Sequence, residues 1–265
     1  MHSRKQLLQK YLRYYLTASN GKGHGIHSPF VFDFVQNVLN DKRHFYAYAQ
    51  IEILREQLLK NEQIIEVEDF GAGSVVSKNK KRSVSDIARY AAKNKKLAQL
   101  LFRIGNHYQP ETIIELGTSL GISSAYLASA CPNAKLFTIE GSAAIAKIAN
   151  KNFHSLGLTN IESITGNFND SIAGVLKKIS KIDLAFIDGN HRKEPTIKYF
   201  SQLLDHSSPY SVFIFDDIHW SGEMEQAWDI IKENARATLT IDLFFIGLVF
   251  FREDFKAKQH FAIRF

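Results

Sequence analysis

The sequence predicts an α/β protein whose strands form a doubly wound, mostly parallel sheet. From about Glu111 onward, apolar runs of strand length alternate with segments of helix length, and acidic residues, amides or glycines follow several of the runs. Such alternation is typical of βαβ crossovers, which bury a parallel sheet on both faces. The composition agrees, because 45% hydrophobic and 23% charged residues in a chain of 265 are ordinary for a globular protein with a sizeable core.

The predicted strands and helices follow one another in a regular order. The strand-like runs are Thr112–Leu116, Lys135–Ile139, Ile161–Thr165, Ile182–Ile187, Val212–Phe215 and Leu239–Phe245. The helical segments after the first five runs are Ile122–Ala130, Ala143–Leu156, Ile172–Ile179, Glu194–Leu204 and Met224–Asn234. The last part differs, because Leu239–Phe251 is almost continuously β-forming around Gly247 and His260–Phe265 adds a short run. We therefore expect a seven-stranded sheet that ends in an antiparallel hairpin.

The residues before Glu111 lack this alternation. They read as helices with a Gly- and Lys-rich stretch, Phe70–Arg82, among them; the helices are Arg4–Leu16, Pro29–Leu39, Ala49–Leu59 and Val84–Asn106. We expect residues 1–110 to form a mainly helical extension and residues 111–265 to form the α/β domain. The extension either serves as a lid or substrate element, or packs as a dimer element, so a homodimer is compatible with the sequence.

Composition also excludes several classes of protein. The single cysteine, Cys131, rules out an internal disulfide and a cysteine-built zinc site. The longest apolar run, Leu243–Phe251, is far shorter than the roughly 20 residues of a membrane span. Met1–Lys10 is polar and basic, unlike a signal peptide. We expect a cytoplasmic protein without a membrane partner. The net charge of +6 is a mild excess, partly in Lys78–Arg82 and Lys93–Lys96, and such runs are more often solvated than bound to nucleic acid.

A glycine loop follows the first predicted strand. It reads Glu115-Leu-Gly117-Thr118-Ser119-Leu-Gly121 and leads into a helix. Glycines allow a sharp turn and a close approach of backbone to ligand, and the helix directs its first N–H groups toward the loop. The spacing differs from the Gly-x-Gly-x-x-Gly pattern that cradles a pyrophosphate, and the preceding carboxylate would repel one. The loop suits a cationic ligand without phosphate, although these glycines could also serve only tight turns.

This loop resembles motif I of class I S-adenosylmethionine-dependent methyltransferases, and the later strand ends continue the resemblance up to about Ile231. The second strand ends on Glu140, where the family has an acid that accepts hydrogen bonds from ribose hydroxyls. The third ends on Asn167 and Phe168, where the family places an acid or amide near the adenine, and the fourth ends on Asp188. The resemblance implies a Rossmann-like fold and S-adenosylmethionine as the cofactor. It places the cofactor against Glu115, Gly117, Thr118, Ser119, Gly121, Glu140, Asn167, Phe168 and Asp188.

The fourth and fifth strands end in a group of acids. Asp188 follows one strand and Asp216 and Asp217 follow the next, so three carboxylates are expected at one sheet edge. Carboxylates this close repel one another without a cation, and an oxygen-rich set suits magnesium. The arrangement resembles the metal-dependent O-methyltransferases of the catechol and macrolide-sugar type. By that match Asp188, Asp216 and Asp217 are ligands of Mg²⁺ or another divalent cation, and His219 is the general base, with Asp188 also catalytic.

Other interpretations remain open at this edge. Asp216 and Asp217 could cap the helix near Ser221 instead of holding a metal. His191, close after Asp188, could reach the acceptor pocket, line the donor site or lie on the surface. The segment Asp69–Ser74 also resembles a glycine loop, but no apolar helix follows it.

These features predict O-methylation of a small-molecule hydroxyl. Amino-methylating enzymes usually carry Asn/Asp-Pro-Pro-Tyr/Phe after the fourth strand, where this sequence has Asp188-Gly-Asn-His191. Enzymes that methylate cytosine at C5 need a nucleophilic cysteine, and Cys131 follows the wrong segment. Two alternatives remain: an RNA methyltransferase, and a non-catalytic module that binds S-adenosylmethionine.

Overall fold

The computed structural model describes residues 1–68 and 80–265. Within these ranges the chain forms two compact units, one of residues 42–179 and one of residues 1–41 with 180–265. The expected boundary at residues 110 and 111 does not coincide with this division, because residues 1–41 pack with the C-terminal strands. The expected glycine loop Asp69–Ser74 and the basic residue Lys78 lie outside the described residues.

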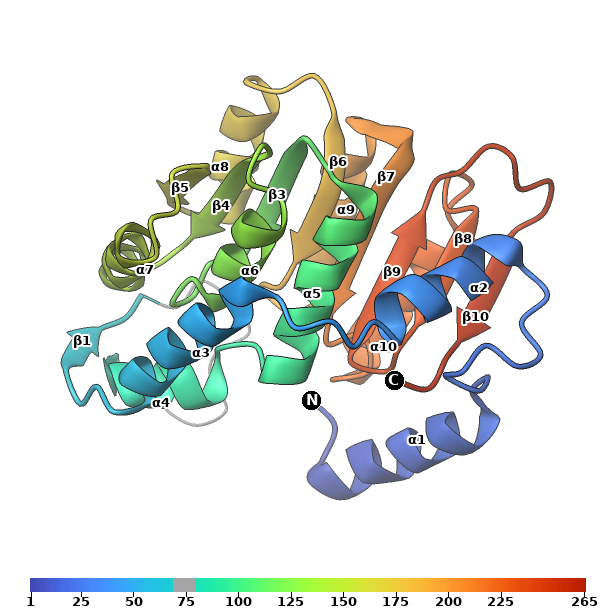
Figure 1. Ribbon diagram of the computed structural model, residues 1–265, viewed down its shortest axis with the longest axis horizontal. Helices are drawn as coiled ribbons and strands as arrows, with labels where there is room; N and C mark the ends of the chain where they lie inside the picture. The colour runs from blue at the N-terminus through green and yellow to red at the C-terminus, as the bar shows by residue number, and fades with distance from the viewer. Residues whose placement is uncertain (69–79) are drawn as a thin grey trace. The chain divides into compact units, whose positions relative to one another are not determined.

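A parallel sheet forms the centre of the unit of residues 42–179. β3 (Thr112–Leu116) pairs with β4 (Lys135–Glu140), and β4 pairs with β5 (Ile161–Thr165), all in parallel. The helices of this unit are α3 (Tyr46–Leu59), α4 (Val84–Tyr90), α5 (Lys95–Tyr108), α6 (Ile122–Ala130), α7 (Ala143–Ser155) and α8 (Phe168–Leu176). Helices α3 and α5 pack against α6 (Figure 1). The three strands confirm the βαβ order that the sequence predicts.

The helices before β3 depart most from the sequence prediction between α4 and α5. The expected helix Val84–Asn106 is divided into α4 and α5, because the side chain of Asn94 accepts the Leu97 N–H at 3.0 Å and starts a new helix. In α5, Leu97, Leu101 and Ile104 recur at helical spacing and are buried. A short antiparallel ribbon, β1 (Ile64–Glu66) with β2 (Lys81–Ser83), was not predicted.

The other unit contains a mixed sheet. β6 runs parallel to β7, β7 antiparallel to β9, β9 antiparallel to β8, and β8 parallel to β10. These strands are β6 (Ile182–Ile187), β7 (Ser207–Asp216), β8 (Leu239–Asp242), β9 (Ile246–Phe250) and β10 (Gln259–Ala262). The antiparallel C-terminal hairpin is therefore confirmed as β8 and β9. It turns at Phe244, whose φ of 70° lies in the left-handed region, so the run expected to end at Phe245 ends at Asp242.

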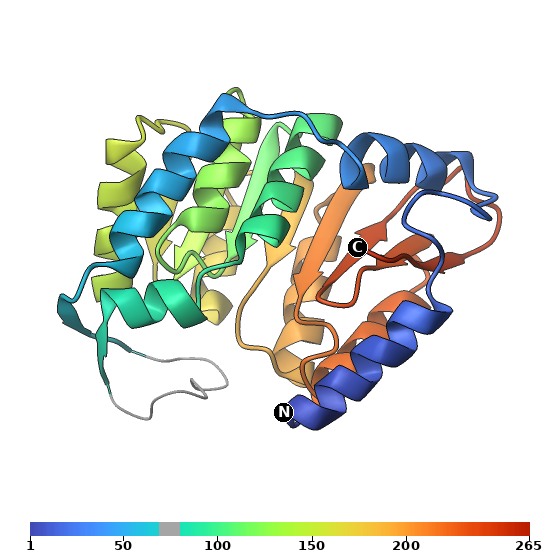
Figure 2. The same ribbon diagram turned by 60° about the horizontal axis from the view of Figure 1, so that its bottom comes forward.

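Helices cover both faces of this mixed sheet (Figures 1 and 2). They are α1 (Arg4–Thr17), α2 (Pro29–Phe34) with a π-helical turn (Val35–Leu39), α9 (Lys193–Leu204) and α10 (Gly222–Glu233). Phe200 of α9 and Trp228 of α10 pack against Phe215 of β7, while Phe30 and Phe34 of α2 contact Phe250 of β9. Among the described residues, β3 to β10 are eight strands, one more than the seven expected. The additional strand is β10, which pairs in parallel with β8.

Candidate active site

The loop between β3 and α6 has the strained backbone expected of a ligand-binding turn. Gly117, Ser119 and Gly121 have φ values of 105°, 48° and 84°, all in the left-handed region. The N–H groups of Gly117 and Thr118 both donate to the carbonyl of Ile139, at 3.0 and 3.2 Å, which fixes the loop against the end of β4. Asn152 of α7 donates to the Leu120 carbonyl at 2.8 Å. The loop is therefore held in shape by the protein itself.

Glu115 lies inside the unit and not on the surface of the loop. Its side chain is fully buried, and its Oε2 accepts hydrogen bonds from the hydroxyls of Ser124 and of Thr138, the latter at 2.7 Å. Thr138 in turn lies 2.6 Å from the Thr118 hydroxyl. Glu115 thus links β3, β4 and α6 beneath the loop, which makes it a support for the expected donor site.

Glu140, at the end of β4, contacts both sides of the expected donor site. Its Oε2 accepts the N–H of Ser119 at 2.8 Å, and its Oε1 accepts the N–H of Ser142 at 2.9 Å. The two N–H groups belong to separate loops and each binds one carboxylate oxygen, so together they fix the orientation of the carboxylate. Glu140 is therefore fixed at the position where the resemblance implies contacts with ribose hydroxyls.

Two buried serine hydroxyls beside Glu140 lack a hydrogen-bond partner among the described residues. The Oγ atoms of Ser119 and Ser142 are buried and have no hydrogen-bond partner in the part of the chain that the structure describes. Ser142 is only 1% exposed and precedes α7 at the N-cap position, yet its side chain makes no capping hydrogen bond. Buried polar atoms of proteins are nearly always hydrogen-bonded, so these hydroxyls fit a ligand that supplies the partner.

The third strand end is also ordered. Asn167 is the N-cap of α8, and its Oδ1 accepts the Asn169 N–H at 2.9 Å, while Phe168 begins the helix. Near it lies an open hollow of about 620 Å³, lined by Ala143, Lys147, Asn150, Lys151, His154 and Thr165. The sequence patterns did not reveal this hollow, because its lining comes from one face of α7 and the end of β5.

A group of potential metal ligands lies at the ends of β6 and β7. The register pairs Ile187 with Phe215, so Asp188 and Asp216, the next residue on each strand, are neighbours. One ligand atom each from Asp188, His191 and Asp216 lie within 4.8 Å of one another. Two carboxylates and an imidazole are a donor set that suits a divalent cation.

His191 belongs to this group because of the shape of its loop. Asn190 and His191 have φ values of 69° and 39°, and the Asn190 amide donates to the Tyr199 hydroxyl at 3.1 Å. His191 Nε2 lies 3.6 Å from Asp188 Oδ1. The sequence left three positions open for this histidine, and only its spacing of three residues from Asp188 pointed to it.

Asp217 is not part of this group of described residues. Its φ is 53°, and its N–H donates to the Phe245 carbonyl at 2.7 Å. It lines a small cavity of about 10 Å³ with Leu7, His219, Trp220, Phe244 and Phe245. β7 ends at Asp216, and the left-handed backbone of Asp217 breaks the strand geometry that places Asp216 beside Asp188. Of the three carboxylates expected as metal ligands, Asp188 and Asp216 thus lie in this group together with His191.

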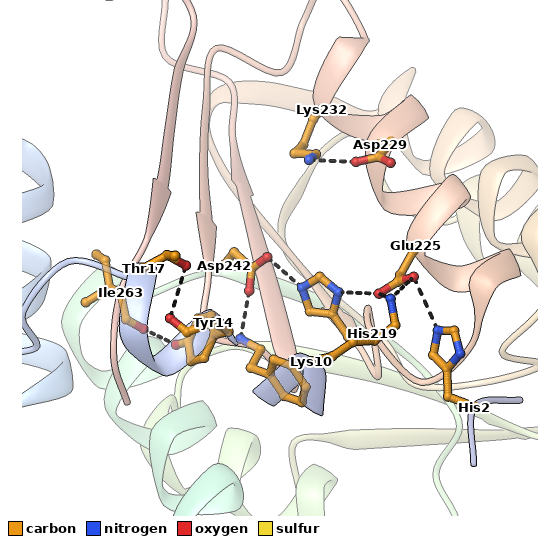
Figure 3. A network of polar contacts seen from close by, with 11 residues as sticks. His2, Lys10, Tyr14, Thr17, His219, Glu225, Asp229, Lys232, Asp242 and Ile263 are labelled. Carbon is orange, nitrogen blue, oxygen red and sulfur yellow. Dashed lines mark hydrogen bonds and ion pairs between the residues drawn. The ribbon is translucent and has the colours of Figure 1, made fainter. Parts of the chain in front are cut away.

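His219 is engaged on both ring nitrogens (Figure 3). Nδ1 lies 3.1 Å from Glu225 Oε1, and Nε2 lies 2.8 Å from Asp242 Oδ2, while its ring stacks on Phe244. Burial lowers the pKa of His219, but the hydrogen bonds and charges of Asp242 and Glu225 together outweigh burial and raise it. Because each ring nitrogen already faces a carboxylate, neither nitrogen is directed toward an acceptor hydroxyl. The geometry supports a structural role for the residue expected to be the base.

Comparisons with known proteins support the methyltransferase resemblance. Residues 114–218 match the family model of a methyltransferase domain. A curated relative, the catechol O-methyltransferase of Niastella koreensis, is 32% identical over 132 residues, which are 49% of this chain and 58% of the relative. The chain therefore matches little more than half of the length of this relative.

Solved structures show the same fold. One is an O-methyltransferase of Streptomyces achromogenes involved in tomaymycin synthesis, in complex with S-adenosylmethionine. It matches with a TM-score of 0.55 and 21% sequence identity, and the match covers 62% of this chain and 82% of that enzyme. Another is an O-methyltransferase of Bacillus cereus in complex with S-adenosylhomocysteine. It matches with a TM-score of 0.54 and 20% sequence identity, and the match covers 83% of this chain and 97% of that enzyme. These structures thus confirm the Rossmann-like α/β fold that the sequence predicts.

Among the described residues, no helix combines the length and the apolar character needed to cross a bilayer.

Proposed function

We propose that this chain is an S-adenosylmethionine-dependent O-methyltransferase that methylates a hydroxyl of a small molecule with the help of a divalent cation. The matched methyltransferase domain, residues 114–218, includes the β3–α6 loop, Glu140, Asp188 and Asp216. The curated relative is a catechol O-methyltransferase, and two solved structures of the same fold contain S-adenosylmethionine or its product. A hydroxyl acceptor, in particular one of two vicinal hydroxyls, agrees with these relatives.

One observation supports the donor site above all others. Glu140 is fixed by the N–H groups of Ser119 and Ser142, and the hydroxyl oxygens of the same two serines are buried without a described partner. A ribose provides two vicinal hydroxyls that can serve both the carboxylate and such serines. Gly117, Gly121 and Asn167 complete the set of residues that would hold the donor.

The chain's own residues would mainly orient the reactants. The sulfonium of the donor is already activated, so transfer requires that the acceptor oxygen lie in line with the methyl group. Asp188, Asp216 and His191 would hold the divalent cation, and their grouping within 4.8 Å supports this assignment. A bound cation would lower the pKa of the acceptor hydroxyl and fix its position. No base beyond this group is assigned, since His219 already faces two carboxylates.

The activity can be tested with the purified chain and S-adenosylmethionine labelled in its methyl group. We expect transfer to catechol-type acceptors and little transfer to the matching monohydroxy compounds. Total RNA serves as a second acceptor in the same assay. Label in RNA alone would assign the chain to RNA methylation. Binding of S-adenosylhomocysteine without transfer to any acceptor would instead indicate a non-catalytic module.

The metal can be tested separately by titrating Mg²⁺ and Mn²⁺ into metal-stripped protein. We expect Asp188→Asn and Asp216→Asn to weaken cation binding on the order of 100-fold, because each removes a ligand and not an outer contact. Asp217→Asn is the matched control, since Asp217 lies beside the small cavity with His219. A loss on Asp217→Asn equal to that on Asp216→Asn would overturn this ligand set.

A further inference from the structure

Helix α1 exposes an apolar stripe. Leu8, Leu12, Tyr15 and Leu16 are 58%, 51%, 49% and 77% exposed, respectively. Their spacing of four, three and one residues places them on one side of a helix. Exposed large apolar residues scattered singly need no explanation, but four along one helix form a continuous patch.

This stripe is distinct from the face by which α1 packs. The packed face contains Tyr14, which is buried and donates its hydroxyl hydrogen to the Ile263 carbonyl, and Tyr11, whose ring lies 5.0 Å from that of Phe244. On the same side Lys10 forms an ion pair with Glu225 at 3.0 Å (Figure 3). Figure 2 shows α1 on the outside of its unit. The helix is therefore anchored through one face and presents the other to solvent.

The charge on α1 is of one sign. The helix contains Arg4, Lys5, Lys10 and Arg13 and no acidic residue, and the first acid in the whole sequence is Asp33. Arg4, Lys5 and Arg13 are exposed. In addition, the guanidinium of Arg264 lies 5.0 Å from the ring centre of Tyr15, at the edge of the stripe. A leucine- and tyrosine-bearing face with a basic surround is thus fixed on the surface of the unit.

We propose that α1 is an interfacial helix that binds the surface of a bilayer containing anionic lipids. Leucines and tyrosines enter the boundary between headgroups and acyl chains, and lysines and arginines pair with the headgroup charge. This mode needs no spanning segment, so it is compatible with the absence of a spanning helix among the described residues. The sequence expectation of no membrane partner considered only spanning runs and signal peptides.

The charge also argues against other occupants. A symmetric contact between two copies of α1 would bring Arg4, Lys5 and Arg13 of one copy close to the same residues of the other. Nucleic acid would match the charge, but it gives no reason for exposed leucines. Anionic lipid matches both the apolar stripe and its basic surround, independently of the proposed methyl transfer.

The test is co-sedimentation of the full chain with vesicles of phosphatidylcholine alone or of phosphatidylcholine and phosphatidylglycerol in a ratio of about 3:1. We expect binding to the anionic vesicles only, weakened at high salt. Arg13→Gln should reduce the partition coefficient about fivefold. Lys256→Gln removes a charge that is also exposed but lies outside α1, and it should have little effect.

The apolar stripe is tested with the double variant Leu12→Gln and Leu16→Gln. We expect at least about a tenfold loss of partitioning, because leucine burial is removed. Ile230→Gln on α10 is the control, since Ile230 is 44% exposed on another helix of the same unit. Circular dichroism checks that each variant folds. Absence of binding to the anionic vesicles, or unchanged binding of the leucine variant, would overturn the proposal. The proposal would also be overturned if the wild type did not bind vesicles and the leucine variant changed from dimer to monomer, because the stripe would then be a contact between two copies of the chain.

Discussion

At the scale of single residues, Gly121 shows what the donor loop requires of its sequence. Its φ of 84° is one that L side chains rarely adopt, and a Cβ there would lie 2.5 Å from the ring of Phe153. Gly157 has a similar φ of 69°, but a Cβ added there would meet no atom within 4 Å. The two glycines thus separate the cost of backbone conformation from the cost of a clash.

We predict that Gly121→Ala destabilises the protein by about 2–5 kcal/mol, the sum of left-handed strain and overpacking. Gly157→Ala should cost about 1–2 kcal/mol, because only the strain applies. Urea unfolding measures both values. Equal losses in the two variants would contradict the role of Phe153. Gly121→Ala should also weaken binding of S-adenosylhomocysteine, whereas Gly157→Ala should not.

The contacts of His219 should make the free energy of unfolding depend on pH. Its pKa is raised in the folded protein, because Asp242 and Glu225 outweigh the effect of burial. A raised folded pKa contributes stability that is fully present below the unfolded pKa of roughly 6.5 and is lost as the pH rises through the folded value. We therefore expect the loss of unfolding free energy in His219→Gln to be larger at about pH 6 than at about pH 9. Unfolding curves in chelator at both pH values provide the measurement, and a loss that grows with pH would argue against the network.

The candidate site could be predicted from the sequence as far as the strand ends but not as far as the side-chain directions. Glu140 and Asn167 lie at the ends of strands as expected, since the apolar runs locate those ends. Glu115 is buried inside its unit, and Asp217 lies outside the group that Asp188 and Asp216 form with His191. Their directions depend on the local φ values and on packing partners distant in the sequence, which a linear pattern does not contain.

At the scale of elements, α1 shows how one residue can anchor a helix. Tyr14 and Tyr15 are adjacent, but Tyr14 is buried with its hydroxyl on the Ile263 carbonyl, while Tyr15 is half exposed. A second backbone contact follows the helix, where Ser19 N–H donates to the Ala262 carbonyl at 2.8 Å. These contacts join the first helix to the last strand, β10.

We predict that Tyr14→Phe costs about 1–3 kcal/mol of unfolding free energy, because it leaves the Ile263 carbonyl without this donor. Tyr15→Phe should change stability by less than about 0.5 kcal/mol, since Tyr15 is 49% exposed. Denaturant unfolding of the two variants side by side is the measurement. The idea fails if Tyr15→Phe is the more destabilising change.

The elements themselves could be predicted well where the hydrophobic pattern is long and regular. The strand at Thr112–Leu116 was predicted to the residue. The ribbon of β1 and β2 was missed, because each of its strands has three residues and no clear alternation. The break between α4 and α5 was missed because Asn94 stands within a basic run that resembles continuous helix. Short elements and caps depend on contacts that periodicity does not record.

At the scale of the whole molecule, the chain passes from one unit to the other and back. Residues 1–41 belong with residues 180–265, and residues 42–179 form the other unit. Any fragment that starts at residue 111 loses helices from both units. Among the lost residues, Val31, Phe34 and Leu101 are fully buried.

We accordingly predict that the fragment 111–265 does not fold to a cooperative structure, because both cores lose buried apolar residues. Circular dichroism and thermal melting of the fragment, compared with the full chain, provide the test. A cooperative melt with native-like helix content would show that residues 111–265 fold without the first 110 residues.

Binding of S-adenosylhomocysteine should raise the melting temperature of the whole chain. Anything that binds the folded chain alone stabilises it by RT ln(1 + [L]/Kd), about 2.7 kcal/mol at 100 times Kd, which is about 5–10 °C for a chain of this size. We expect S-adenosylhomocysteine to produce such a rise in the wild type. Glu162→Ala, which removes an acid paired with Lys135 and Lys178 at the surface, should retain the rise. Glu140→Ala should lose most of it, because the carboxylate between Ser119 and Ser142 is removed. Each variant is compared with its own melting temperature without ligand, so a general loss of stability does not imitate the effect. An undiminished rise in Glu140→Ala would place the donor elsewhere, because that variant lacks the carboxylate that is proposed to accept the ribose hydroxyls.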